Sequence, residues 1–359
     1  MNHHSVSWES SASLQDCRRV LEQIYENRYF TNHGPLAQRL ESRLEELLGV
    51  GNVIAVGNES LALLIALAGF QVSGDVVVPA FCGQAAVETC AWLKLPVRQC
   101  DVDPLTHQPS LDSLRRVIDK QVAAVCLVET WGNRCDPAIL QWLGEQGIAV
   151  VIQALDSFAS RSEEGHVCQS PHVVTVFGLG PERIVSSLQG GLIATSDDAL
   201  GEVFRNIRSS YGTRQKVDVI ATCNGRFSEF QAGVGLRSLS RLLDTLVRNQ
   251  AVAEIYQAKL GDVKGLSLYG FPGTVAPNHQ CCPVIVSGDF SVTRNELVRR
   301  LTERGFPVHV VKPSCGTFPL TDRLQRELML LPVARDSYEN SEQSQRIATQ
   351  VADAIIELA

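Results

Sequence analysis

Residues 173–195 read VVTVFGLGPERIVSSLQGGLIAT, and the interpretation of this stretch decides the fold of the chain. An apolar run at 173–177 is followed by a loop that glycine and proline interrupt. A second apolar run, at 192–195, starts directly after the pair Gly190-Gly191. Short β-rich runs separated by turn-forming residues predict strands, so we expect a strand, a loop and a second strand here.

Upstream of this stretch the sequence alternates between two periodicities. Runs rich in β-formers are separated by segments with apolar residues at helical spacing. The expected strands are 53–56, 76–78, 97–102, 122–128 and 149–152, and the expected helices are 13–26, 36–48, 60–69, 83–94, 111–119 and 136–147. This alternation predicts an α/β fold in which a mainly parallel sheet is covered by helices on both faces. Ligands of such sheets bind at the carboxyl ends of the strands, so we expect the site there.

Downstream, the pattern predicts helices followed by a smaller α+β domain. Residues 197–260 are expected to be helical, with a long helical pattern at 228–259. The elements expected after it are strands at 282–286 and 308–311, helices at 294–304 and 343–358, and a surface loop at 336–344. We therefore expect a large α/β domain over residues 1–250 and a small C-terminal α+β domain over 251–359.

Composition argues against several classes of partner. The 359 residues carry a net charge of −7, which gives no basic surface for nucleic acid or for an acidic membrane. No apolar stretch reaches the roughly 18 residues that a spanning helix needs, and the first residues lack the pattern of a signal peptide. We expect a soluble protein of the cytoplasm.

Cysteine and histidine usage does not indicate a metal site. None of the eleven cysteines shows Cys-x-x-Cys spacing, and most lie in apolar runs, which favours buried free thiols. The histidines are scattered along the chain, and an isolated histidine is more often structural than a ligand. We expect no bound metal.

Several short motifs carry a resemblance to a known family. They are found at 27–35 (NRYFTNHGP), 56–60 (VGNES), 78–81 (VPAF), 101–104 (DVDP) and 223–232 (CNGRFSEFQA). Together they resemble DegT-type sugar aminotransferases over nearly the whole chain. The resemblance implies the fold-type I aminotransferase architecture, pyridoxal phosphate (PLP) as cofactor, and a dimer whose site is built from two subunits.

The family binds PLP through a lysine eight residues before a Gly-Gly pair, and in this chain that position is Glu182. The six lysines of the chain are at 94, 120, 216, 259, 264 and 312, so none lies between 121 and 215. The chain also has no histidine in the loop, whereas a dehydratase branch of the family uses histidine there. Lys216 matches a lysine that the family often has outside the reactive site.

Two further parts of the family's cofactor site are changed. Gly83 stands where the family has an aromatic residue that covers the cofactor ring, and Ala154 aligns with the aspartate that pairs with the ring nitrogen. Asp156, two residues further on, would have to be displaced by about 6.6 Å to replace that aspartate. Ser157 stands where the family often has glutamine.

The part of the site that would bind phosphate is better preserved. Asn58 and Ser60 lie between a strand and a helix, where backbone amides bind anions, although Glu59 replaces the family's glycine. Asn224 matches a residue that in the family reaches the phosphate bound by the neighbouring subunit, and Arg226 follows it as in the family.

These residues support three hypotheses about function. The first is a homologue without transamination that binds a nucleotide sugar or another anionic ligand through residues such as Arg226 and Arg183, as a homodimer or paired with an active paralogue. The second is an enzyme with different chemistry that uses Glu182, Asp156 or Glu129 as acid or base. The third is an aminotransferase that borrows Lys216 from elsewhere in the chain, or an aminotransferase or dehydratase that acts on a keto sugar with noncovalently bound PLP or pyridoxamine phosphate (PMP).

Overall fold

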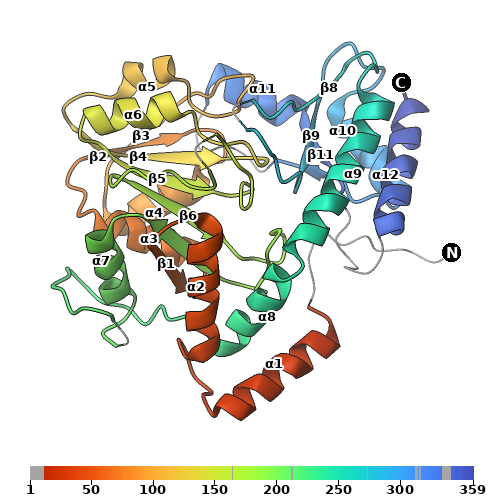
Figure 1. The fold of residues 1–359 in the computed structure, drawn as a ribbon. Helices are drawn as coiled ribbons and strands as arrows, with labels where there is room; N and C mark the ends of the chain where they lie inside the picture. Colours follow the sequence, from red (N-terminus) through yellow and green to blue (C-terminus); the bar gives the residue numbers. More distant parts are fainter. Residues whose placement is uncertain are drawn as a thin grey trace.

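The computed structural model describes residues 12–359 apart from 164, 212, 273, 312, 313, 315, 316 and 334–340. In this part of the chain a seven-stranded sheet has the order β1-β7-β6-β5-β4-β2-β3 (Figure 1). Its strands are β1 (Asn52–Val56), β2 (Asp75–Pro79), β3 (Val97–Cys100), β4 (Val122–Glu129), β5 (Ala149–Ala154), β6 (Val173–Gly178) and β7 (Gly191–Thr195). Only β7 runs antiparallel to its neighbours, β6 and β1. The predicted α/β fold with a mainly parallel sheet is confirmed.

Helices cover both faces of this sheet because its strands alternate apolar residues between the two sides. Ile54 and Val56 face a core formed with α3 (Glu59–Gly69), α4 (Gln84–Leu93) and α7 (Asp198–Arg208). Val53 and Ala55 face the opposite side, where α2 (Pro35–Leu48) packs. On that side α5 (Leu111–Val117) and α6 (Pro137–Glu145) cover the β4 and β5 region.

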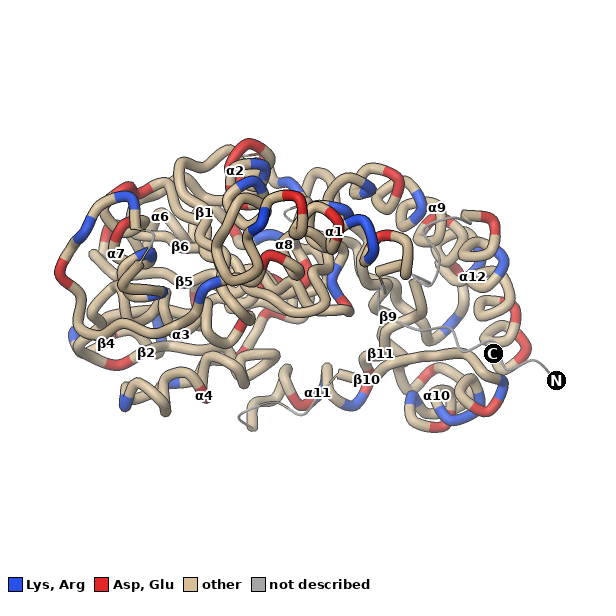
Figure 2. The backbone as a smooth tube through the Cα atoms, turned by 90° about the horizontal axis from the view of Figure 1, so that it is seen from below, with Lys and Arg blue, Asp and Glu red and all other residues tan. Residues whose placement is uncertain are grey.

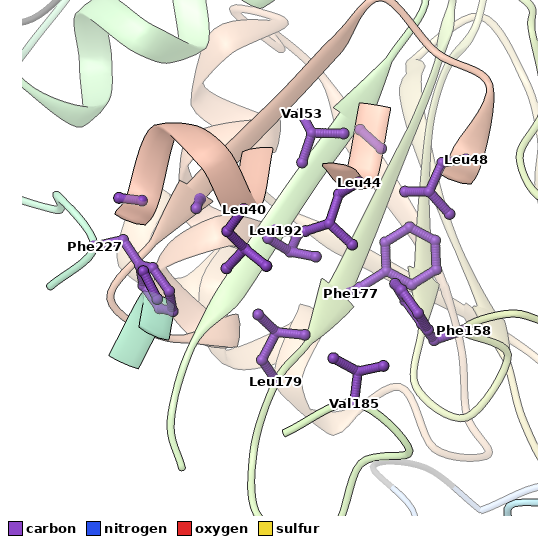
Figure 3. Packing of buried hydrophobic residues seen from close by; sticks show 14 of the residues in the cluster. Leu40, Leu44, Leu48, Val53, Phe158, Phe177, Leu179, Val185, Leu192 and Phe227 are labelled. Carbon is purple, nitrogen blue, oxygen red and sulfur yellow. The ribbon is translucent and has the colours of Figure 1, made fainter. Parts of the chain in front are cut away.

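The packing of α2 against the sheet shows how this apolar spacing is used (Figure 3). Leu40 and Leu44, one turn apart, point at Val53, Phe177 and Leu192 from three adjacent strands. All five side chains are fully buried. Burying a leucine contributes about 2 kcal/mol, so this layer fixes α2 over β1, β7 and β6.

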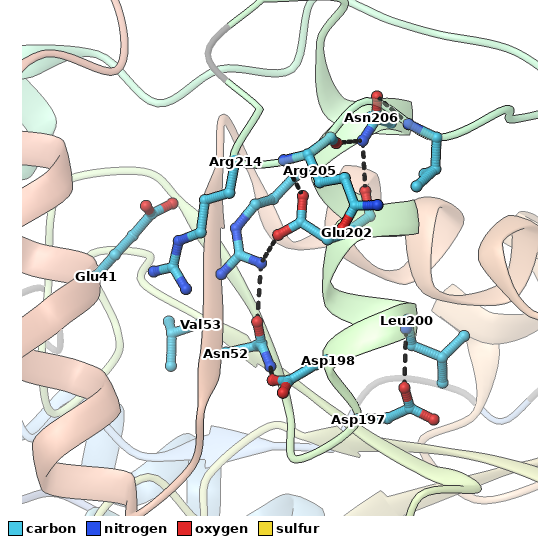
Figure 4. A network of polar contacts seen from close by, with 12 residues as sticks. Glu41, Asn52, Val53, Asp197, Asp198, Leu200, Glu202, Arg205, Asn206 and Arg214 are labelled. Carbon is cyan, nitrogen blue, oxygen red and sulfur yellow. Dashed lines mark hydrogen bonds and ion pairs between the residues drawn. The ribbon is translucent and has the colours of Figure 1, made fainter.

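A polar network holds the edge strand β1 to α7 (Figure 4). Asn52 Nδ2 donates to Asp198 Oδ1 at 2.8 Å, and Asn52 Oδ1 accepts from Arg205 Nη1 at 2.8 Å. Arg205 also pairs with Glu202 at 3.0 Å. Helix α3 begins three residues after β1. By holding β1 in place, this network also positions the start of α3, where backbone amides are expected to bind an anion.

A second, four-stranded sheet with the order β10-β11-β9-β8 lies in the C-terminal part of the chain. The elements of this part are β8 (Leu266–Leu268), β9 (Cys282–Val286), α10 (Arg294–Glu303), β10 (His309–Val310), α11 (Pro319–Glu327), β11 (Leu328–Leu331) and α12 (Ser341–Ile356). Helix α9 (Leu242–Leu260) runs through residue 250, the expected domain boundary. Its Leu242 packs in the first core and its Val252 in the second.

Several sequence-based expectations about elements are wrong. The helical pattern over 197–260 contains three helices, α7, α8 (Glu229–Leu239) and α9, and residues 209–228 form none in their described part. That segment contains β-branched residues of low helix propensity, and its Cys223 and Gly225 amides bond to carbonyls at the end of α7. Residues 336–340 of the expected loop lie outside the described residues, and 341–344 belong to α12.

Charged side chains lie on the surface helices, and most of the described cysteines are buried. Acidic and basic residues mix along the outer helices α10 and α12 (Figure 2). The ten described cysteines are all free, six of them buried, which confirms the expected thiols in this part of the chain. No described helix has the length and apolarity to cross a membrane. Helix α1 (Leu14–Asn27) packs on α8 at the periphery (Figure 1).

Candidate active site at the strand ends

In the loop between β6 and β7, one charged side chain is buried at the strand ends, whereas its neighbour in sequence is exposed to solvent. Glu182, the residue expected at the position of the family lysine, has a side chain that is 53% exposed. The next residue, Arg183, is only 13% exposed. Its Nη1 donates to the Leu155 carbonyl at 2.6 Å and to Asp156 Oδ1 at 3.1 Å. Arg183, not Glu182, is therefore the side chain that enters the site.

The start of α3 supplies a second partner for Arg183. Asn58 caps the helix by accepting from the Leu61 amide at 2.8 Å. Glu59 Oε2 accepts from Arg183 Nη2 at 3.0 Å. Ser60 is exposed beside them. Burial lowers the pKa of Arg183, but Glu59, Asp156 and Glu182 outweigh that effect and hold the pKa above its ordinary value.

Asp156 is held by three segments of the chain. Besides Arg183, its Oδ1 accepts from Gln280 Nε2 at 2.8 Å, and its Oδ2 accepts from the Trp131 amide at 3.3 Å. Asn278 Nδ2 donates to its backbone carbonyl at 2.6 Å. The segment 278–280 was not identified from the sequence. Its only signal is a polar triplet, Asn-His-Gln, which one cysteine separates from the apolar strand β9.

Glu129 is separate from the Arg183 cluster. Its carboxylate is fully buried, accepts from the Cys135 amide at 3.0 Å and from the Ser157 hydroxyl, and lies 3.3 Å from Arg134 Nε. The Cys135 and Arg134 contacts lie in the segment after β4, and the Ser157 contact joins the end of β4 to the segment after β5. Of the three acid–base candidates, only Glu182 and Asp156 therefore contact Arg183.

Asn224 and Arg226 lie on the surface beside the start of α3. The Gly57 amide donates to the Gly225 carbonyl at 3.0 Å, and Arg226 forms an isolated bridge with Val56 at the end of β1. Asn224 is exposed and accepts from Arg226 Nε at 3.3 Å. The two residues thus lie beside the segment that leads from β1 into α3, at the border of the site.

The ring-nitrogen position needs a correction. Ala154 packs in the core that α2 covers, on the side away from α3. Gln153 points to the α3 side instead, where its Nε2 donates to Glu59 Oε1 at 3.0 Å. Successive residues of a strand face opposite sides, so an alignment error of one residue exchanges their roles. The residue that faces the cofactor region is Gln153.

These residues do not fit PLP. The loop offers no amine, and the Glu59 carboxylate stands at the helix start where a phosphate would bind. A Cβ on Gly83 would lie 2.0 Å from the Pro79 carbonyl oxygen, so no aromatic ring can be attached there without moving the backbone. Gln153 Oε1 lacks a described hydrogen-bond partner and could accept from a ring nitrogen. A neutral amide, however, supplies no charge to make the ring an electron sink.

Next to the site, a buried histidine makes stability depend on pH. Trp131 Nε1 donates to His107 Nδ1 at 3.1 Å, which requires a neutral ring. Burial lowers the pKa of His107 to about 4, although Asp103 opposes the shift. Because the unfolded state binds this proton more readily, the stability is lost as pH falls from about 6.5 towards 4. At pH 5 one such histidine costs about 2 kcal/mol.

Glutamine at position 107 keeps a hydrogen-bond acceptor but does not titrate. We therefore expect the free energy of unfolding of His107→Gln to fall by about 2 kcal/mol less than that of the wild type between pH 7 and pH 5. Urea unfolding at the two pH values measures the difference. His33, whose pKa burial also lowers to about 4, remains in both proteins and cancels from the comparison. Equal pH slopes in the two proteins would contradict the assignment.

Comparison with known proteins agrees with the fold and with the motifs. The model of the DegT/DnrJ/EryC1/StrS aminotransferase family matches residues 13–346. A dTDP-4-amino-4,6-dideoxy-D-glucose transaminase from Shigella dysenteriae is 28% identical over 291 residues, which are 80% of this chain and 78% of that enzyme.

Two solved structures share the fold at low sequence identity. DesI in the presence of its TDP-sugar product has a TM-score of 0.87 at 21% identity, over 98% of this chain and 92% of that one. The E. coli GDP-4-keto-6-deoxy-D-mannose-3-dehydratase with bound hydrated PLP has a TM-score of 0.81 at 15% identity, over 96% and 100%. The chain belongs to the DegT/DnrJ/EryC1/StrS aminotransferase family.

Proposed function

We propose that this family member has lost transamination and serves as a ligand-binding or partner protein in nucleotide-sugar, amino-sugar or natural-product biosynthesis. The observation that carries the proposal is the position of Arg183, which pairs with Glu59 and Asp156 where the family would place its cofactor. Glu182 supplies a carboxylate at the lysine position, and a carboxylate forms no imine with an aldehyde.

The ligand we propose is a nucleotide sugar bound at the rim of the site. The Shigella relative is, by its name, a transaminase of a dTDP-amino sugar. Arg226 is half-buried, and its guanidinium lies 5.5 Å from the centre of the Tyr211 ring. An arginine held in this way can bind diphosphate oxygens, with Asn224 as a neighbouring polar group. Inside the site, three carboxylates surround the single guanidinium of Arg183, so a phosphate would be repelled there.

We expect Arg226→Ala to weaken binding of dTDP-glucose, used as the probe, by about tenfold, because a charge-assisted hydrogen bond contributes about 1.5 kcal/mol or more. Isothermal titration calorimetry measures the dissociation constant. Arg43→Ala is the matched control, since the one ion pair that Arg43 forms within the described residues is with Glu46 on the exposed side of α2. Unchanged binding in Arg226→Ala, or an equal loss in the control, would contradict the rim site.

Loss of transamination has a separate spectroscopic test. Purified protein mixed with PLP and freed of excess by gel filtration should show no aldimine absorbance. Borohydride reduction should then leave no stoichiometric label on any of the six lysines. A chromophore fixed to one lysine would refute the proposal.

A second candidate function is acid–base chemistry on a keto sugar. It is favoured by the exposure of Glu182, whose carboxylate lies 3.4 Å from Arg183 Nε at the mouth of the site. A product formed from a nucleotide keto sugar and abolished by Glu182→Gln would support this function over simple binding.

We also propose that the chain acts as a dimer, either with a second copy or with an active paralogue. Asn224 is exposed, as a residue that reaches a neighbouring subunit must be. On α1 and the turn after it, Leu14, Leu21, Tyr25 and Phe30 are also exposed, and exposed apolar residues gathered in this way mark interaction surfaces. Sedimentation velocity distinguishes the monomer from the homodimer.

A further inference from the structure

A closed set of hydrogen bonds surrounds Arg183 at the strand ends. Arg183 Nη1 donates to Asp156 Oδ1 at 3.1 Å, and the same oxygen accepts from Gln280 Nε2 at 2.8 Å. Gln280 Oε1 accepts from the amide of Ile184, the residue after Arg183, at 2.6 Å. The loop, the end of β5 and the segment before β9 are thereby joined through one guanidinium.

The other side of Arg183 is closed by the start of α3. Glu59 Oε2 accepts from Arg183 Nη2 at 3.0 Å, and Glu59 Oε1 accepts from Gln153 Nε2 at 3.0 Å. Glu59 is the first residue of α3, where the helix dipole favours a negative charge. A carboxylate of the protein therefore takes the favourable position that a phosphate would need.

The space between these groups and the sheet is filled. A Cβ added to Gly178, at the end of β6, would lie 2.1 Å from Glu59 Oε2 and 3.1 Å from Arg183 Nε. Nonbonded atoms do not approach as closely as the first of these distances without displacement. A planar ring cannot enter between β6 and α3 while both side chains keep their positions.

We propose that Arg183 is a built-in substitute for the cofactor. Its guanidinium connects the start of α3 to the end of β5, and the Glu59 carboxylate replaces the phosphate at the helix. The folded site excludes PLP and is stable without it. The proposal goes beyond the proposed function, because it concerns the interior of the site and holds for any ligand bound at the rim.

The stabilising role is tested by a double-mutant cycle. We expect Arg183→Met to lower the melting temperature by about 5 °C, since removal of one partner leaves buried carboxylates unpaired. Adding Glu59→Gln should recover about half of the loss, because it removes one of the two charges left behind. The exposed control Arg43→Met should change the temperature by less than about 1 °C.

Exclusion of the cofactor is tested by opening the site. Glu182→Lys alone should bind no stoichiometric PLP after gel filtration. The triple variant Glu182→Lys, Arg183→Ser, Glu59→Gly should bind it and, after borohydride, show a mass increase on the peptide that contains position 182. Circular dichroism and a cooperative thermal transition confirm that each variant is folded.

The outcomes separate the two proposals. Binding of PLP by Glu182→Lys alone, or none by the folded triple variant, overturns the role of Arg183 and Glu59 in exclusion. No recovery in the Arg183→Met, Glu59→Gln double variant overturns the stabilising role. Failure of the wild type to bind dTDP-glucose counts against the rim site only, because that titration does not depend on the interior network.

Discussion

Replacement of Glu229 by alanine is expected to lower the free energy of unfolding by about 4 kcal/mol. Glu229 is 1% exposed and accepts three backbone amides, from Gly34 at 2.9 Å, Leu36 at 2.9 Å and Ala37 at 3.0 Å. Pro35, between them, has no N–H to offer. Without the carboxylate, all three buried donors at the start of α2 lose their acceptor, and each costs about 1 to 3 kcal/mol.

Urea unfolding measures this loss as a lower midpoint at an unchanged slope. Glu229→Gln should be milder, because the amide keeps one acceptor oxygen in the same place. Glu46→Ala is the control, since its exposed pair with Arg43 contributes less than about 1 kcal/mol. A change below 1 kcal/mol in Glu229→Ala would show that water replaces the carboxylate.

Glu229 also explains why two motifs that carried the family resemblance occur together. The motif at 27–35 and the motif at 223–232 bond directly to each other: the His33 amide donates to the Phe227 carbonyl at 2.7 Å, and the Glu229 amide donates to the Thr31 carbonyl at 3.3 Å. They form one structural joint between α2 and α8. The two motifs therefore predicted the fold correctly. Their contacts in this joint explain why they occur together without any catalytic role.

Periodicity predicted the large sheet because its strands are buried on both faces and its helices have one apolar side. It failed where the elements are short or their apolar pattern is continuous. β8 has three residues, too few for a period to be recognised, and the strand expected at 308–311 is only two residues long, as β10. The apolar spacing of α8 continues into α9, so the break at Ser240 leaves no local signal.

The candidate site was predictable only in part for a related physical reason. Counting from Gly190 placed the loop correctly and identified Glu182 and Arg183 as its charged residues. The partners of Arg183 come from segments far apart in sequence, and such contacts leave no trace in local spacing. Gln280 lies 124 residues from Asp156, for example, and joins it only in the folded chain.

Arg208→Met is expected to destabilise the protein by about 4 kcal/mol, comparable to the loss in Glu229→Ala. Arg208 is fully buried on α7, and its Nη1 donates to Glu41 Oε1 at 2.7 Å and to the Ala55 carbonyl at 3.2 Å. Burial raises the pKa of Glu41, and Arg208 opposes that rise. Removing the guanidinium leaves a carboxylate inside the core with only the Ala55 amide, at 2.8 Å, as a described hydrogen-bond donor.

The pH dependence identifies the cause of the loss. Without Arg208 the pKa of Glu41 rises further above its unfolded value, so the folded variant takes up a proton more readily than the unfolded chain. The loss should therefore be largest at pH 8 and shrink as pH falls. Adding Glu41→Gln should recover part of the stability at pH 8 and remove this difference in pH slope, as urea unfolding of the single and double variants would measure. A loss that is the same at pH 8 and pH 5 would instead indicate a packing defect, because a cavity does not titrate.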